Sequence, residues 1–209
     1  MPDFSLEDAI DGPVCGLDEV GRGPLAGPVV AACVYIPDHV RPLPFIGEIR
    51  DSKKLSEAKL ESLNTLISEH CAFAVTEITP QEIDEINILQ ASLKAMATSL
   101  ERMSVSIRHA LVDGNRCPAH MPCPATPVVK GDSVSTSIAA ASIIAKAHRD
   151  RIMRALAQEH PHYGWGSNVG YPSPQHLAGI DAHGITNHHR KSFAPVRNFI
   201  EFGSTKKRA

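Results

Sequence analysis

Four acidic side chains stand where short apolar segments of the chain end. Asp18 and Glu19 follow a run that begins at residue 14, Asp113 closes a second run, and Asp132 follows a third. Carboxylate oxygens are the ligands that Mg²⁺ and Mn²⁺ prefer, and strand ends commonly line the site of an α/β sheet. Any one of these acids also fits a turn or a helix cap. Together they are candidate ligands for divalent metal ions.

Asp18 and Glu19 are adjacent, which raises a geometric question. Neighbouring side chains of a regular strand point to opposite faces, so these two cannot both face one ion from ideal geometry. We therefore expect the strand to bend here. Gly21 and Gly23 follow directly, and glycine permits both such a departure and a close approach of backbone N–H groups to a ligand.

The segments around these acids alternate between strand and helix patterns. Val-rich or alternating apolar runs predict strands, and leucine or isoleucine at helical spacing after Ser56 predicts a capped amphipathic helix. Pro80 suits the first turn of another helix. We expect strands at residues 14–20, 28–36, 73–78, 107–112 and 127–129, and helices at 56–70, 80–103 and 133–160. The alternation predicts an α/β core.

The last quarter of the chain is basic. Residues 1–149 carry 13 Lys and Arg against 19 Asp and Glu, whereas residues 150–209 carry 8 against 4. We expect residues 1–160 to form the core and residues 161–209 a helical C-terminal extension with a basic tail, in the same compact unit. Positive potential there suits a phosphate backbone, although a solvated surface gives the same pattern.

The composition is that of an ordinary globular protein, with 43% hydrophobic and 21% charged residues. No apolar run reaches the roughly 18 to 20 residues that a membrane span needs, and the first twelve residues are acidic. We therefore expect a cytoplasmic protein without a membrane role. The five cysteines lack C-x-x-C pairing and are expected to be reduced, mostly in the core.

Several histidines lie close together near the C-terminus. No two of them stand four residues apart on a helix together with a glutamate, which is the arrangement of a metalloprotease. The sequence therefore predicts no zinc site. These residues are His160, His162, His183, His188 and His189.

Residues 15–29, CGLDEVGRGPLAGPV, closely resemble the first signature of bacterial ribonuclease HII, the type 2 ribonuclease H. Further segments agree in order along nearly the whole chain. They are DSKKL at 51–55, VDG at 112–114, KGD at 130–132, IAAASIIAK at 138–146, GYP at 170–172 and HRKSF at 189–193.

The resemblance implies a ribonuclease H-like fold, a mixed five-stranded sheet flanked by helices with a helical C-terminal extension. It also implies an endoribonuclease that cuts the RNA strand of RNA–DNA hybrids, including single ribonucleotides embedded in duplex DNA, as in ribonucleotide excision repair. Asp18, Glu19, Asp113 and Asp132 match the family's metal-binding positions, which imply Mn²⁺ or Mg²⁺, two with substrate bound. We expect two-metal-ion hydrolysis giving 5′-phosphate and 3′-hydroxyl ends.

The resemblance also assigns substrate contacts. Gly21, Arg22 and Gly23 match the loop that reads the substrate, where backbone groups suit a 2′-hydroxyl, and Tyr171 matches the tyrosine that stacks on a sugar. Val169 stands where lysine is more usual, which affects a phosphate contact. Candidate phosphate contacts, for which solvated side chains are the alternative, are Lys53, Lys54, Arg190 and Lys191.

Three other readings stay open. A silent nucleic-acid clamp would share the fold, and a resolvase would share the acids. Type 3 enzymes usually carry an extra N-terminal domain and a fourth acid that is glutamate, so Asp132 favours type 2. Nothing demands more than a monomer, and no replication-clamp peptide is evident in the tail.

Overall fold

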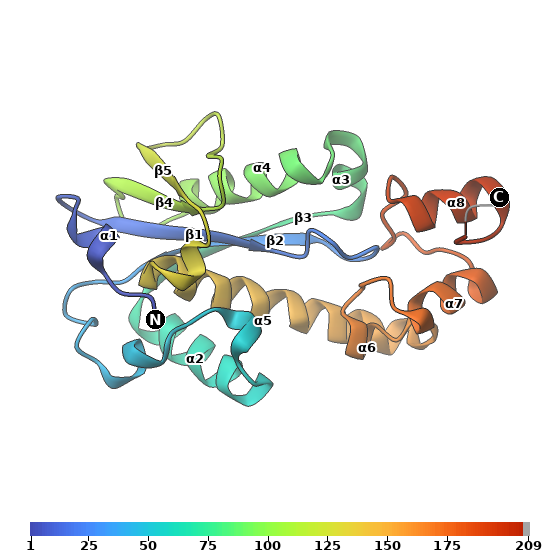
Figure 1. Ribbon diagram of the computed structural model, residues 1–209, viewed down its shortest axis with the longest axis horizontal. Coiled ribbons are helices and arrows are strands. Elements are labelled where there is room, and N and C mark those ends of the chain that lie inside the picture. Colours follow the sequence, from blue (N-terminus) through green and yellow to red (C-terminus); the bar gives the residue numbers. More distant parts are fainter. Residues whose placement is uncertain (207–209) are drawn as a thin grey trace. The chain divides into compact units, whose positions relative to one another are not determined.

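The computed structural model describes residues 1–206, and its centre is a five-stranded sheet in the order β3-β2-β1-β4-β5 (Figure 1). β1 pairs with β2 antiparallel and with β4 parallel, and β4 pairs with β5 parallel. The predicted mixed five-stranded sheet is therefore confirmed. The strands are β1 (Val14–Val20), β2 (Val29–Tyr35), β3 (Ala72–Ile78), β4 (His109–Asp113) and β5 (Ala125–Val128).

The chain divides into two compact units, each assembled from separate segments. Unit 1 comprises Met1–Val20, Val30–Thr76 and Ser92–Ala147, and unit 2 comprises Gly21–Val29, Glu77–Ala91 and His148–Ala209. A single boundary at residue 160 stays a prediction, and the last three residues of the predicted tail lie outside the described part. The helices are α1 (Ser5–Asp8), α2 (Glu57–His70), α3 (Pro80–Ile86), α4 (Ile88–Glu101), α5 (Thr136–Glu159), α6 (Trp165–Asn168), α7 (Pro174–His183) and α8 (Ala194–Phe202).

In unit 1, α2 and the first half of α5 cover one face of the sheet and α4 covers the other (Figure 1). The Ser99 hydroxyl of α4 donates to the Ala31 carbonyl of β2 at 3.1 Å. At Gly16 of β1, an added Cβ would overlap the backbone of Ser137 and Ile138, so glycine allows β1 and the start of α5 to touch. This contact fixes α5 beneath the strand that carries Asp18.

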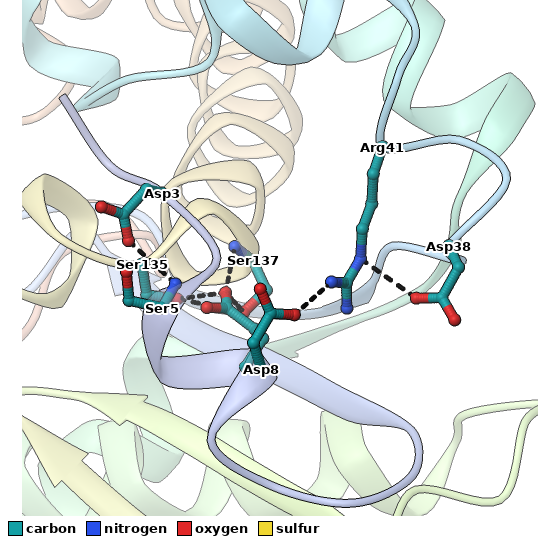
Figure 2. Close-up of polar contacts among 8 residues, drawn as sticks. Asp3, Ser5, Asp8, Asp38, Arg41, Ser135 and Ser137 are labelled. Atoms are coloured by element: carbon teal, nitrogen blue, oxygen red, sulfur yellow. Dashed lines mark hydrogen bonds and ion pairs between the residues drawn. The ribbon is translucent and has the colours of Figure 1, made fainter.

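The start of α5 is also held by the N-terminal segment. One carboxylate oxygen of Glu7 accepts from the Ser135 hydroxyl at 2.7 Å and from the Ser137 backbone N–H at 2.9 Å and hydroxyl at 2.7 Å. Figure 2 shows Ser135 and Ser137 in this network, beside a separate one in which Arg41 binds Asp8 and Asp38. Glu7 thereby caps the helix that begins four residues after Asp132, a role with no signature in the sequence.

Two expected elements differ from the structure. The helix predicted over residues 80–103 is two helices, because Asn87 adopts a φ of 67° and its side chain accepts from the N–H groups of Leu89 and Gln90. Asparagine tolerates this conformation and favours helix starts. Asp132 does not end a strand but lies in a 3₁₀ turn, Gly131–Ser133, after β5.

The interior of unit 2 contains a chain of neutral histidines. His176 donates through Nδ1 to the Tyr171 carbonyl at 2.9 Å and accepts at Nε2 from the Trp165 indole at 3.0 Å. His189 accepts at Nδ1 from the Thr186 N–H at 3.0 Å, which leaves its Nε2–H to face His176 at 3.2 Å. Burial lowers the pKa of both imidazoles, that of His189 to about 3.

All five cysteines are free, and only Cys15 and Cys33 are buried, so the expectation of mostly core positions was wrong. Within residues 1–206, no helix is long and apolar enough to span a membrane.

Candidate metal centre

Three of the four predicted acids converge in unit 1. Asp18, Glu19 and Asp113 each offer a carboxylate oxygen, and these oxygens lie within 4.8 Å of one another. Asp18 is 6% exposed, whereas Glu19 and Asp113 are half-buried, so the cluster is partly open to solvent. An all-oxygen set of this kind fits Mg²⁺ or Mn²⁺.

The two adjacent acids share the site without the expected bend. The β1–β2 ladder continues through Asp18 and Glu19, whose partners are Ala32 and Ala31. The parallel β1–β4 ladder instead stops at Leu17, so the acids lie beyond the last paired residue on that side. An Asp18 oxygen accepts from the backbone N–H of the following residue, Glu19, at 2.7 Å. β1 is therefore continuous at these two residues. The acids reach the common site through the orientation of their side chains.

Asp113, the last residue of β4, ties the cluster to the turn that carries Asp132. Its carboxylate accepts from the Gly131 N–H at 2.7 Å. Asp132 is near enough for its charge to raise the pKa of Asp113. Among the described residues, however, the close group has three members, and the Asp132 carboxylate is not one of them.

Burial and mutual repulsion make the ionised carboxylates of this cluster unfavourable. Burial chiefly, and then the charges of Glu19 and Asp113, raise the pKa of Asp18 well above its usual value. Burial also raises the pKa of Asp113, against the effects of the Gly131 N–H and of Lys53. A bound cation would relieve this repulsion, so the electrostatics and the donor set both fit a divalent ion.

The glycine loop between β1 and β2 lies in unit 2, where two buried arginines bind its carbonyl groups. Arg149 donates to the carbonyls of Pro28 at 3.0 Å and Ala26 at 3.1 Å. Arg190 donates to those of Gly27 at 3.0 Å, Arg22 at 3.1 Å and Gly21 at 2.6 Å. Burial lowers the pKa of Arg149 to about 10 and that of Arg190 to about 9. The loop is shaped by charge–dipole contacts.

This arrangement corrects the prediction for Arg190, which is 0% exposed and does not present its guanidinium to a phosphate. Its place in a basic segment suggested a surface role, but its partners are loop carbonyls more than 160 residues earlier in the chain. The neighbouring Lys191 is exposed, and its backbone N–H donates to Asp84 at 2.8 Å.

Gly21 and Gly23 are required for different reasons. Gly21 has a φ of 90°, and a Cβ there would overlap Arg149. At Gly23 a Cβ would lie 3.1 Å from the ring of Tyr171, which is 47% exposed. Tyr171 and Gly23 therefore form one surface, next to the exposed Arg22.

The remaining predicted contacts belong to different units, Lys53 and Lys54 to unit 1 and Val169 to unit 2. Lys53 and Lys54 are exposed, and Lys54 pairs with Asp51 at 3.7 Å. Val169 has a φ of 43°, which is strained for a β-branched residue. Its carbonyl accepts from Arg149 at 2.9 Å.

A mixed five-stranded sheet with carboxylates gathered at the end of β1 and β4 defines a protein with the ribonuclease H fold. A solved structure of ribonuclease H2 from Pyrococcus horikoshii OT3 superposes with a TM-score of 0.77, covering 92% of this chain and 99% of that one, at 25% identity. Bst-RNase HIII in complex with Mn²⁺ shares the fold at a TM-score of 0.68 and 19% identity, covering 93% of this chain and 71% of that one.

Sequence comparison narrows the class to one family. The family model described as Ribonuclease HII matches residues 15–196. The Ribonuclease HII of Paramagnetospirillum magneticum is 48% identical over 97% of this chain and 100% of that protein. The chain therefore belongs to the ribonuclease HII family, metal-dependent endonucleases that cleave the RNA of RNA–DNA hybrids.

Proposed function

We propose that this chain hydrolyses the RNA strand of RNA–DNA hybrids and also cuts DNA duplexes at single embedded ribonucleotides. The observation that carries the proposal is the convergence of Asp18, Glu19 and Asp113 on one accessible point. These acids, with Asp132, would hold divalent ions, Mn²⁺ or Mg²⁺. When bound, two such ions would supply activation of the attacking water and stabilisation of the leaving oxygen, and cleavage would give 5′-phosphate and 3′-hydroxyl ends.

Asp132 has a separate place in this proposal. Because its carboxylate is outside the close group of three, we expect it to contribute little to metal binding by the free protein and more to turnover. Asp113 should contribute to both. Comparing Asp113→Asn with Asp132→Asn, by metal titration and by cleavage rate, separates the two roles.

The surface of Gly23 and Tyr171 is proposed to contact the ribonucleotide. The carbonyls of Gly21 and Arg22 are bound by Arg190, so recognition of a 2′-hydroxyl by this loop is expected to use its N–H groups. The Tyr171 ring would stack on the sugar, a contact worth roughly 1 to 3 kcal/mol by analogy with base stacking. Lys53, Lys54, Lys191 and Arg22 are the proposed phosphate contacts.

The deciding experiment uses an end-labelled DNA duplex with one ribonucleotide, an all-DNA duplex and a four-way junction. We expect a single cut beside the ribonucleotide, dependent on added Mg²⁺ or Mn²⁺ and lost in Asp18→Asn. Binding without cutting would indicate a clamp, and cutting of the junction alone would indicate a resolvase. Tyr171→Ala removes the ring proposed to stack on the sugar, and Tyr171→Phe is its matched control because phenylalanine keeps the ring.

Gly21→Ser is a poor test of ribonucleotide selectivity. The positive φ and the overlap with Arg149 would disturb the loop itself. Tyr171→Ala changes an exposed side chain and leaves the backbone conformation in place. Selectivity for ribonucleotides, measured as the ratio of the cleavage rates on the duplex with one ribonucleotide and on the all-DNA duplex, should fall in Tyr171→Ala and persist in Tyr171→Phe.

A further inference from the structure

A second group of metal-ligand side chains lies in unit 2. It contains Glu159, the last residue of α5, His160 beside it, and His188 from the loop before α8. One ligand atom from each lies within 4.8 Å of the others. No spacing rule joins these residues in the sequence, because His188 is 28 residues from His160.

The geometry can accommodate an ion with small side-chain movements. Around tetrahedral zinc, donors about 2.0 to 2.2 Å from the metal lie about 3.3 Å from one another. Rotation of the exposed Glu159 side chain would bring its carboxylate oxygen nearer to the two imidazoles, towards that separation. None of these three side chains forms a hydrogen bond or ion pair with another residue in 1–206. Their ligand atoms are therefore available.

The two imidazoles are held in place by neighbouring groups. The buried Trp165 ring lies edge-on to both, with centroid distances of 5.6 Å to His160 and 6.3 Å to His188. The backbone of His188 is fixed by the Thr186 hydroxyl at 3.2 Å and by the Gly27 N–H at 2.9 Å. Such support limits the reorganisation needed on binding.

Charge and donor type favour zinc over the ions proposed for the acid cluster. Two imidazoles and one carboxylate form a nitrogen-rich set that suits Zn²⁺, whereas Mg²⁺ favours oxygen. Burial and the nearby His160 lower the pKa of His188, against the effect of Glu159. A lowered pKa favours the neutral imidazole of His188, which is the form that binds metal.

We propose that Glu159, His160 and His188 form a Zn²⁺ site that joins the end of α5 to the loop before α8. A fourth position is left for water. His188 lies two residues before Arg190, which binds the carbonyls of the glycine loop. The site would therefore stabilise the segment from which Arg190 acts, without taking part in hydrolysis.

The test is zinc titration of the untagged full-length protein against a chromogenic chelator, in excess Mg²⁺ to occupy the acid cluster. We expect one bound Zn²⁺, with affinity reduced at least tenfold in His188→Gln and in Glu159→Gln. His162→Gln is the control, since His162 stacks on His183 at 4.0 Å and is outside the group. Its zinc affinity should equal that of the unmodified protein.

Two further readouts make the result decisive. Zn²⁺ should raise the melting temperature of the unmodified protein and of His162→Gln, and leave that of His188→Gln unchanged. NMR of the imidazole nitrogens should show Zn²⁺-dependent shifts at His160 and His188. Equal zinc affinity in all four proteins, or shifts confined to other histidines, would overturn the proposal. If His188→Gln folds poorly, Glu159→Gln still tests the proposal, because Glu159 is exposed and its replacement should not disturb folding.

Discussion

Asp18 combines burial with negative charge, and this combination links metal binding to stability. Its pKa is raised because the folded protein disfavours the carboxylate beside Glu19 and Asp113. Between the ordinary carboxyl pKa and the raised one, the folded state binds more protons than the unfolded state. Stability of the metal-free protein therefore falls as pH rises through this window.

We predict that Asp18→Asn stabilises the metal-free protein at neutral pH by about 1 to 2 kcal/mol while abolishing cleavage. Asparagine keeps an oxygen that can accept from the Glu19 N–H. Urea unfolding with and without Mn²⁺ measures the effect. Mn²⁺ should stabilise the unmodified protein and not the variant; equal stabilisation of both would contradict the proposed ligand role.

At the scale of elements, the glycine loop takes its shape from two arginines and the start of α5 takes its position from Glu7. Both depend on hydrogen bonds between segments remote in sequence. Loss of one partner leaves buried polar groups unsatisfied, which is more destabilising than the net value of the bonds.

We predict that Arg190→Lys destabilises the protein by about 2 to 4 kcal/mol, because lysine cannot reproduce the planar set of donors to three carbonyls. Cleavage should also slow, since the loop is no longer held. Lys191→Ala is the matched control on the next residue. It should keep full stability and change only the salt dependence of substrate binding, measured by titration at several ionic strengths.

Glu7 offers a comparison of charge with hydrogen bonding. Glu7→Ala should lower the free energy of unfolding by about 2 to 3 kcal/mol, because three donors at the start of α5 lose their acceptor. Glu7→Gln keeps an acceptor oxygen and should lose less than about 1 kcal/mol, from the helix dipole. Urea denaturation of both variants checks this. Equal losses would show that charge, rather than hydrogen bonding, is the main contribution.

Across the whole molecule, buried neutral histidines predict sensitivity to acid. The pKa of His189 is lowered to about 3, while the unfolded chain binds a proton near the ordinary value of 6.5. The contribution of neutral His189 to the free energy of unfolding is complete above pH 6.5. It is lost as pH falls towards 3, at a rate of at most about 1.4 kcal/mol per pH unit.

Unfolding free energies at pH 7.5, 6 and 5 test this prediction. The unmodified protein should lose about 2 kcal/mol from His189 by pH 5. In His189→Asn the decline should be shallower, with a remainder from His176, whose pKa is also lowered. The same slope in both proteins would show that His189 is not the source.

Local sequence patterns predicted the elements, and contacts between remote segments account for what they missed. Ser56 caps α2 as expected, accepting from Lys59, and three acids at strand ends meet as expected. Periodicity contains no information on a buried guanidinium whose partners are backbone carbonyls, so Arg190 was misplaced. The grouping of His160 with His188 likewise arises only when the chain folds.

The discontinuous makeup of unit 2 has a consequence for protein synthesis. A ribosome releases the glycine loop roughly 120 residues before Arg149 and roughly 160 before Arg190. At about 5 to 20 residues per second, the nascent loop waits on the order of ten to thirty seconds for Arg190. A growing polypeptide thus presents Asp18 and Glu19 long before residues 21–29, which follow them in sequence, acquire the carbonyl contacts that Arg190 supplies.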